Sequence, residues 1–358
     1  GLAYALAAVA GFGIATAYVV PWAMVPDVVE YDQVRSGQRR EGSYYAFASF
    51  FQKLATGAAL WGMGQTLALT GYLTPAVGGP APVQPAAEAL VLGMGGSAFA
   101  GSAAALVAGQ AGRRAVVHRS YGLPSWAAAA RPLVVAVSHS GGTKETLDGL
   151  QAARIAGLPL AMVTGGGELA ALAAAEGHPL VEVCSPPPPR SAAGCLTGSV
   201  LRIFEAAGLV PPQSDGLREA ADVVESLVGK GDGPAAALAE DLAAALDHRV
   251  AVVYGAEGVG ALAAYRWKTQ INENGKAIAY CSPLPELDHN EIEAWSTYPG
   301  ISRDRIGVVW LRDPGDDPRL VRRADVTRDL LAGRVGLAGE VHAQGEGLLA
   351  RLFSLVVV

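Results

Sequence analysis

Short apolar runs alternate with Ala-rich segments of helical periodicity over most of the chain. One set comprises EALVLG, RAVVHR, PLVVAVS, PLAMVT and HPLVEV, and a second comprises RVAVVYG, KAIAYC, RIGVVWL and GRVGLAGEVHA. Continuous apolar runs are typical of strands buried on both faces of a parallel sheet, and each parallel connection needs a crossover, usually a helix. A Gly/Asp-rich break at residues 229–233 separates the two sets. The sequence therefore predicts an α/β fold with two doubly wound domains and parallel sheets, residues 89–228 and 229–358.

The N-terminal part follows a different pattern. Residues 1–26 and residues 54–73 contain no charged side chain, and a polar, arginine-rich loop joins them. At about 1.5 Å per helical residue, runs of this length can cross a hydrocarbon core of about 30 Å. We therefore predict a two-helix membrane-like hairpin over residues 1–73 and a Pro/Gly-rich linker over residues 74–88. A buried Ala/Gly-rich hairpin and a signal peptide are the alternatives.

The segment PWAMVPDVVEYDQVRSGQRREGSYYAFASFFQKL resembles part of the glycoside-pentoside-hexuronide cation symporters, which are transporters of the major facilitator type. The resemblance covers residues 1–75 only. Those symporters have many more spans, so two helices cannot form a translocation path. Lys53 matches a lysine near the cation site of that family, but we assign it no transport role.

Charge and cysteine content exclude several kinds of function. The net charge is −6 and the pI is near 5.6, so the chain lacks the basic surplus that general nucleic-acid binding requires. Its three cysteines, Cys184, Cys195 and Cys281, are scattered without the spacing of a zinc site or a disulfide framework. We therefore expect no metal, no nucleic-acid partner and a reducing cytoplasmic environment.

Glycines and a hydroxyl follow the first predicted strand, in LVLGMGGSAFAGS. Gly96 and Ser97 would offer backbone amides and a hydroxyl at the start of the next helix. Gly93, Gly95 and Ala98 also match the dinucleotide fingerprint G-x-G-x-x-A. However, the following strand, RAVVHR, offers no acidic residue for a ribose.

Three hydroxyls follow the third predicted strand, in PLVVAVSHSGGTKETL. Ser138, Ser140 and Thr143 lie on a turn that opens the next helix. Helix capping would explain one of them, but not three beside two glycines. This loop therefore predicts a site for a phosphate monoester.

The S-x-S-G-x-T loop, with the upstream GGS, resembles the sugar isomerase (SIS) domain. The motifs YGLPSW, VTGGGELAALA, PPPRSAAG, YRWKTQINENGK and PELDHNEIEAW resemble the bifunctional phosphoglucose/phosphomannose isomerases, over residues 89–358. The resemblance implies isomerisation of glucose 6-phosphate or mannose 6-phosphate to fructose 6-phosphate through a cis-enediol, without a cofactor. It also implies a cytoplasmic homodimer that acts in glycolysis and gluconeogenesis.

Site residues follow from the same resemblance. The substrate phosphate would be bound by Gly96, Ser97, Ser138, Ser140 and Thr143. Glu273 would move a proton between C1 and C2, and Arg190 would stabilise the charge of the enediolate. His289 would assist ring opening from the neighbouring subunit.

Simpler roles remain open for these residues. Arg190 could pair with an acid such as Glu182, His289 could belong to an acidic surface, and Glu273 could be a solvated charge. Two alternative functions also remain. One is a non-catalytic SIS protein that binds sugar phosphates, and the other is a transporter fragment fused to an inactive isomerase remnant.

The chain departs from the isomerase pattern at three places. A linker and the hairpin stand where the family has a helix before GMGGS, and Ser102 occupies a position where an acidic residue is common. The sequence begins without Met and stops within a predicted helix, GLLARLFSLVVV, so we expect a truncated, less stable second domain with an uncovered apolar face. The positive-inside rule would place the isomerase part outside the membrane. We therefore expect a fusion of unrelated parts, with residues 1–73 in the membrane.

Overall fold

The computed structural model describes residues 24–38, 40–51, 53, 88–183 and 191–358, and the backbone of residues 189–190. The chain divides into two compact units, Gly1–Gln84 and Pro85–Val358. Both predicted membrane spans fall largely outside the described residues, so the two-helix hairpin stays a prediction. Within the described part, no helix is both long and apolar enough to cross a bilayer.

The described part of the first unit is helical. Helices cover residues 24–36 and 41–51. Asp32 and Arg40 form an ion pair of 3.2 Å across the connection, and the Ser36 hydroxyl donates to the Asp32 carbonyl at 2.7 Å. Much of the expected polar loop is therefore helical, and the ion pair between Asp32 and Arg40 bridges the two helices.

The first sheet of the second unit has five parallel strands in the order β2-β1-β3-β4-β5. Its elements are β1 (Glu88–Leu92), α3 (Gly95–Gln110), β2 (Arg114–His118), α4 (Ala127–Ala130), β3 (Leu133–Ser138), α5 (Lys144–Ile155), β4 (Leu160–Thr164), α6 (Gly167–Glu176), β5 (Leu180–Glu182), η1 (Pro189–Ala192) and α7 (Ala193–Ala206). The central strands are buried along almost their whole length, as their apolar runs require. The predicted parallel sheet is thus confirmed.

The second sheet has four parallel strands in the order β7-β6-β8-β9. Its elements are α8 (Ser214–Val228), α9 (Pro234–Leu246), β6 (Val250–Ala256), α10 (Val259–Glu273), β7 (Ala279–Leu284), α11 (Leu287–Asn290), η2 (Ala294–Ser296), α12 (Pro299–Arg305), β8 (Ile306–Arg312), α13 (Pro318–Leu331), β9 (Gly336–His342) and α14 (Leu348–Val356). In both sheets the first strand has its next two strands on opposite sides. This is the topology that creates a ligand crevice at the carboxyl ends of the strands.

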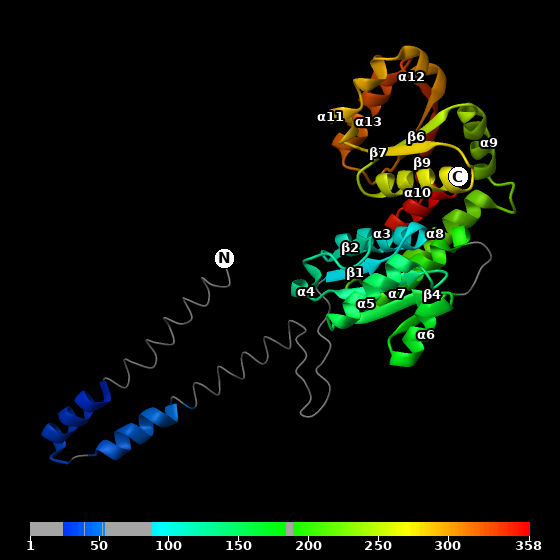
Figure 1. Ribbon diagram of the computed structural model, residues 1–358. Helices are drawn as coiled ribbons and strands as arrows, with labels where there is room; N and C mark the ends of the chain where they lie inside the picture. Colours follow the sequence, from blue (N-terminus) through cyan, green and yellow to red (C-terminus); the bar gives the residue numbers. More distant parts are fainter. Residues whose placement is uncertain (1–23, 39, 52, 54–87, 184–188) are drawn as a thin grey trace. The chain divides into compact units, whose positions relative to one another are not determined.

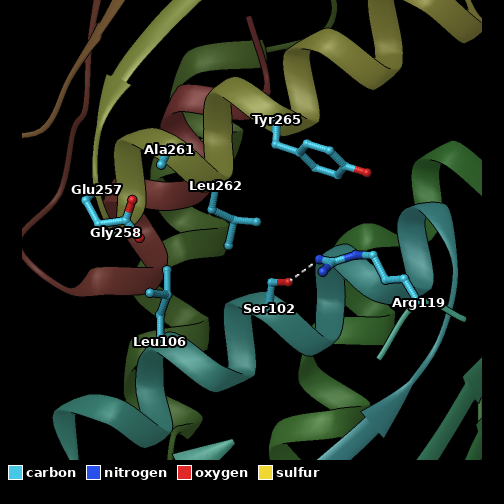
Figure 2. A pocket seen from close by; sticks show the side chains of 8 residues that line it. All are labelled: Ser102, Leu106, Arg119, Glu257, Gly258, Ala261, Leu262 and Tyr265. Carbon is cyan, nitrogen blue, oxygen red and sulfur yellow. Dashed lines mark hydrogen bonds between the residues drawn. The ribbon is translucent and has the colours of Figure 1, made fainter. Parts of the chain in front are cut away.

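Helices α3, α8, α10 and α14 lie between the two sheets (Figure 1). One apolar core runs through this layer, and the rings of Phe99 and Phe353 meet edge to face at 6.2 Å within it. Helix α3 and helix α10 run antiparallel, with Ser102 and Leu106 of α3 facing Tyr265 and Leu262 of α10 (Figure 2). Because the pairing is antiparallel, the C-terminal turns of α10 approach the N-terminal turns of α3 (Figure 2).

The last helix is better covered than the sequence led us to expect. Leu349, Leu352 and Leu355 of α14 are at most 2% exposed, because α8 and α10 pack against the helix. The Trp267 indole N–H donates to the Leu355 carbonyl at 2.6 Å, which occupies one carbonyl of the last turn. The expectation of an uncovered apolar face was therefore wrong for these leucines, since their partners are distant in sequence.

Candidate active site

The three hydroxyls after β3 form one cluster. The Ser138 Oγ lies 2.8 Å from the Thr143 Oγ1 and 3.5 Å from the Ser140 Oγ. Ser138 is 1% exposed, whereas Thr143 occupies the N-cap position of α5 and makes no side-chain capping bond. The backbone N–H groups of Gly141 and Gly142 donate to Ser138 and Ser140 at 3.1 and 3.3 Å. Helix capping therefore does not explain Thr143, and the loop holds its hydroxyls together.

A neighbouring glycine loop braces this turn. Gly141 has φ +69°, and a Cβ there would lie 1.8 Å from the Gly166 carbonyl oxygen. The Leu169 N–H, in the first turn of α6, donates to the Gly141 carbonyl at 3.0 Å. Only glycine fits a backbone that approaches this closely in a left-handed conformation. The VTGGGE segment thus keeps the hydroxyl turn in its bent shape.

The glycine loop after β1 lies beside the hydroxyl turn. Strands β1 and β3 are neighbours, and a Cβ at Gly93 would lie 3.2 Å from the Val137 carbonyl oxygen. Gly96 and Ser97 follow in the first turn of α3, where Ser97 is 8% exposed. The N-cap residue of α3, Met94, offers no side-chain acceptor. Two helix N-termini and the hydroxyl cluster thus meet at one crevice, which favours an anion.

The matching crevice of the second sheet is lined by charged side chains. The loops after β6 and β8 contribute carboxylates at Glu257, Asp313, Asp316 and Asp317. Asp313 pairs with Arg351 at 2.7 Å. Burial, and to a lesser extent the charge of Asp313, raise the pKa of Asp316 to about 6. The guanidinium groups of Arg312 and Arg351 lie beside these carboxylates, so this crevice presents charges of both signs.

Glu273 is the last residue of α10, and its side chain is exposed. It follows Arg266 by two helical turns and therefore lies on the same face of the helix. The guanidinium of Arg266 lies 5.4 Å above the Phe99 ring, and its Nη1 is 3.5 Å from the position of a Cβ on Gly96. Because α3 and α10 are antiparallel, α10 runs toward the N-terminal turns of α3 as it approaches its end at Glu273 (Figure 2). The role of Glu273 at the hydroxyl cluster stays a prediction.

Arg190 falls in the turn η1, and its side chain lies outside the described residues. The residue that follows it, Ser191, lines a cavity of about 490 Å³ together with Arg266, Leu217 and Phe353. The segment that carries Arg190 therefore reaches the neighbourhood of Arg266. The role of its guanidinium stays a prediction.

His289 follows a strand of the second sheet, whereas the hydroxyl cluster follows β3 of the first sheet. It is exposed on α11, after the edge strand β7, and in the described part of the chain its imidazole makes no hydrogen bond. The acids around it are engaged elsewhere: Asp288 accepts from the Thr327 hydroxyl at 2.8 Å, and Glu291 accepts from the Tyr254 hydroxyl at 3.0 Å. The segment is therefore fixed on both sides of His289.

A partly buried network that sequence reasoning missed supports this segment. Tyr254 accepts from the Trp295 indole at 3.1 Å, and the Ser282 hydroxyl donates to Glu291. Burial and the nearby Glu291 carboxylate raise the pKa of Tyr254. Tyr254 and Glu291 are 37 residues apart in the sequence, so no local pattern indicated their contact.

Arg266 was also missed, although it stands in the YRWKTQINENGK motif. Its signal in the sequence was a charged residue seven positions before Glu273, on the same helical face. Burial lowers the pKa of the Arg266 guanidinium, and the negative charge of Glu273 acts in the opposite direction. Within the described residues, no cluster of His, Cys, Asp and Glu could hold a metal ion.

Most of the chain is similar to known proteins. The bacterial phospho-glucose isomerase C-terminal SIS domain matches residues 235–358. The bifunctional phosphoglucose/phosphomannose isomerase of Caldicellulosiruptor bescii is 33% identical over 273 residues, which are 75% of this chain and 80% of that protein. The protein of the same name from Aquifex aeolicus is 32% identical over 274 residues, 74% of this chain and 79% of that protein.

The fold has solved counterparts at low identity. A tagatose-6-phosphate ketose/aldose isomerase from Escherichia coli has a TM-score of 0.54 at 15% identity, covering 76% of this chain and 82% of its own. A protein from Thermus thermophilus has a TM-score of 0.57 at 16% identity, covering 76% and 78%. These similarities support the arrangement of sheets and helices, and no more.

The N-terminal part matches different proteins. The MFS/sugar transport protein family matches residues 1–109. An uncharacterized symporter of Synechocystis is 44% identical over 84 residues, which are 24% of this chain and 15% of the symporter. The predicted resemblance of this segment to a symporter is thus confirmed over a small part of that protein.

Proposed function

The chain belongs to the bifunctional phosphoglucose/phosphomannose isomerases, and we propose that it interconverts glucose 6-phosphate or mannose 6-phosphate with fructose 6-phosphate. The observation that carries this proposal is the crevice at the carboxyl ends of β1 and β3. There the hydroxyls of Ser138, Ser140 and Thr143 converge beside the first turn of α3. Hydroxyls and helix N-terminal amides donate hydrogen bonds to phosphate oxygens, so Gly96 and Ser97 complete a site for the ester.

The reaction needs one base beyond the phosphate site. Glu273 removes a proton from C2 of the aldose and returns it to C1, while a proton is gained at O1 and the hydroxyl proton of O2 is lost, so that the reaction passes through a cis-enediol. Glucose and mannose 6-phosphates differ only at C2, and this carbon becomes planar in the enediol. One carboxylate can therefore serve both substrates. A positive group near O1 and O2, here Arg190, stabilises the enediolate.

Ring opening precedes enolisation, and we assign it to His289. Because His289 is exposed and lies after an edge strand, it is suited to reach the crevice of a second copy rather than its own. The anchored acids Asp288 and Glu291 hold its segment in a defined position. The proposal therefore includes a homodimer whose two subunits each complete the site of the other.

The N-terminal part enters this proposal separately. We propose that residues 1–73 form a membrane-contacting hairpin derived from a symporter, while the isomerase part acts on cytoplasmic sugar phosphates. The segment that matches symporters supports its origin only. Transport is not assigned to it.

A coupled assay with fructose 6-phosphate tests the isomerase proposal. The full chain, the Glu273→Gln variant and an exposed control, Glu240→Gln on α9, are compared at equal concentration. Loss of a positioned base is expected to lower kcat by about 10² to 10⁴ in Glu273→Gln only. Equal rates for the chain and Glu273→Gln would remove Glu273 from the mechanism.

A further inference from the structure

A cavity of about 240 Å³ lies at the carboxyl ends of the strands of the second sheet. It is lined by Ala256, Arg312 and His342, the last residues of β6, β8 and β9. Strands β7 and β8 lie on opposite sides of β6, and doubly wound sheets bind ligands at such a point. The volume exceeds the roughly 30 Å³ share of one water molecule and is below the roughly 300 Å³ of larger ligand pockets, so the cavity fits a small molecule.

Two side chains that line this cavity carry buried N–H groups without a hydrogen-bond partner among the described residues. One is the indole Nε1 of Trp310, a residue that is 2% exposed and packs edge to face against Tyr254 at 5.2 Å. The other is Nη1 of Arg312, whereas Nη2 of the same residue donates to Asp325 at 2.6 Å. Burying a donor without an acceptor is unfavourable, so the two N–H groups favour a ligand that brings acceptor oxygens.

Two ion pairs border the cavity and balance their own charges. Arg312 pairs with Asp325 at 2.6 Å, and Asp313 pairs with Arg351 at 2.7 Å. Asp316 also lines the cavity, and burial, with the charge of Asp313 as a smaller contribution, raises its pKa to about 6. At neutral pH an anion would meet the Asp316 carboxylate, which repels it, and a simple cation would bring no acceptor for the two N–H groups. The cavity therefore favours a neutral ligand.

We propose that this cavity is a second ligand site, which binds a small neutral polyhydroxy compound, a sugar or polyol without a phosphate ester, through Trp310, Arg312 and Asp316. A hydroxyl group accepts and donates at once, so it satisfies the N–H groups and also donates to the Asp316 carboxylate. The carbon atoms of such a ligand meet the apolar side chains of Leu284 and Val321, which line the cavity as well. The phosphate crevice belongs to the first sheet, so this site is separate from the proposed isomerase site.

Nuclear magnetic resonance of the full chain, labelled with nitrogen-15 in its tryptophan indoles, tests this site with sorbitol as the probe. The chain has six tryptophans, and the indole signal that is absent from Trp310→Phe is assigned to Trp310. That signal is expected to shift and to saturate as sorbitol is added, because its N–H gains an acceptor. If no indole signal shifts with sorbitol at about 100 mM, well above a Kd of about 1 mM, the proposal is overturned.

Two neighbouring acids provide a variant and its matched control. Asp316→Ala removes an acceptor from the cavity and is expected to raise the Kd for sorbitol about tenfold, as loss of a hydrogen bond to a charged group does. Asp317 is exposed, does not line the cavity and caps α13 through the Arg319 N–H. Asp317→Asn keeps a capping residue and removes the charge, so it should leave the Kd unchanged. Equal Kd values for the two variants would overturn the proposal.

Gluconate separates a polyol site from an anion site, because it carries a carboxylate where sorbitol carries a terminal hydroxyl group. At pH 8 the Asp316 carboxylate repels it, and its Kd is expected to be about tenfold higher than that of sorbitol, or more. Gluconate that binds as tightly as sorbitol would overturn the assignment to neutral ligands. Sorbitol carries no phosphate and turnover is not measured, so failure of the isomerase proposal would be seen separately, in the coupled assay.

Discussion

The hydroxyl oxygens of Ser138 and Thr143 lie 2.8 Å apart, although Ser138 ends a strand and Thr143 precedes a helix. Neither hydroxyl is used to cap α5, and the Ser138 hydroxyl accepts from the Gly141 N–H. The pair is thus built into the turn: one of its two hydroxyl protons joins the pair, and the other can be donated to a ligand. A phosphate monoester carries the acceptor oxygens that such a pair would meet.

Removal of the Thr143 hydroxyl should weaken substrate binding more than turnover. Thr143→Val is expected to raise the KM for fructose 6-phosphate about tenfold, because a hydrogen bond to a charged group is lost, and to lower kcat by less. Thr143→Ser should restore the KM. Steady-state kinetics of the coupled assay measure both constants.

Thr146 provides the control for this substitution. It lies on α5, is 1% exposed, and its hydroxyl makes no hydrogen bond in the described structure. Thr146→Val should therefore leave the KM unchanged. Equal KM values for Thr143→Val and the unmodified chain would contradict phosphate binding by this hydroxyl.

Asp316 predicts a specific dependence of stability on pH. Its pKa is raised to about 6 by burial and by Asp313, so the folded chain holds a proton that the unfolded chain has released. The stability that this proton contributes is complete below the unfolded pKa, about 3.9, and is lost as the pH rises through about 6. Asp316→Asn should therefore be more stable than the unmodified chain at pH 7, with the difference vanishing near pH 4.

Denaturant unfolding at several pH values between 4 and 8 tests this dependence. The half-buried position of Asp316 exposes it partly to solvent screening, so the expected gain at pH 7 is about 1 kcal/mol or less. Asp222→Asn, at an exposed position on α8, is the matched control and should show no such trend. A gain from Asp316→Asn that is the same at pH 4 and pH 7 would refute the assignment.

The parts of this structure that the sequence predicted are those that local patterns determine. Apolar runs indicated the strands, and the residues directly after β3 indicated the hydroxyl turn, because both are coded over a few consecutive positions. Ser138, Ser140 and Thr143 lie within six consecutive residues, so a single turn is enough to bring their hydroxyls together, as predicted.

Contacts between distant elements could not be predicted in this way. Arg266 meets Gly96 across 170 positions of sequence, and Trp267 meets Leu355 across 88. Such pairs depend on how α3, α10 and α14 pack between the sheets, and periodicity predicts which face is apolar but not its partner. The covering of α14 and the anchoring of Asp288 by Thr327 were missed for the same reason.

Ser102 and Arg119 offer a test of the layer between the sheets. The Arg119 guanidinium donates to the Ser102 hydroxyl at 2.8 Å and lies 5.7 Å from the centre of the Tyr265 ring (Figure 2). Ser102→Asp would place a carboxylate at that donor and is expected to stabilise the fold by about 0.5 kcal/mol at low salt. Thermal unfolding at low and high salt measures the gain, which should shrink as salt rises.

A double-mutant cycle tests whether the Arg119 guanidinium is the partner of the carboxylate introduced at position 102. In the Arg119→Met background, Ser102→Asp should give no gain, since the carboxylate would have lost its cation. A gain that survives this background would mean that the aspartate acts through another group.

His289 and Glu273 allow the proposed division of the site between subunits to be tested directly. Glu273→Gln and His289→Ala are each expected to be inactive as homodimers, because every site then lacks one group. In a mixed dimer, one site lacks both groups, while the other combines Glu273 of one chain with His289 of its neighbour and is intact. Random mixing of equal amounts yields mixed dimers as about half of the population, so about one quarter of the activity should return. The two variants are unfolded together, refolded and assayed with fructose 6-phosphate, and each variant refolded alone serves as the control. If His289 acted within its own chain, every site in the mixture would lack one group and no activity would return.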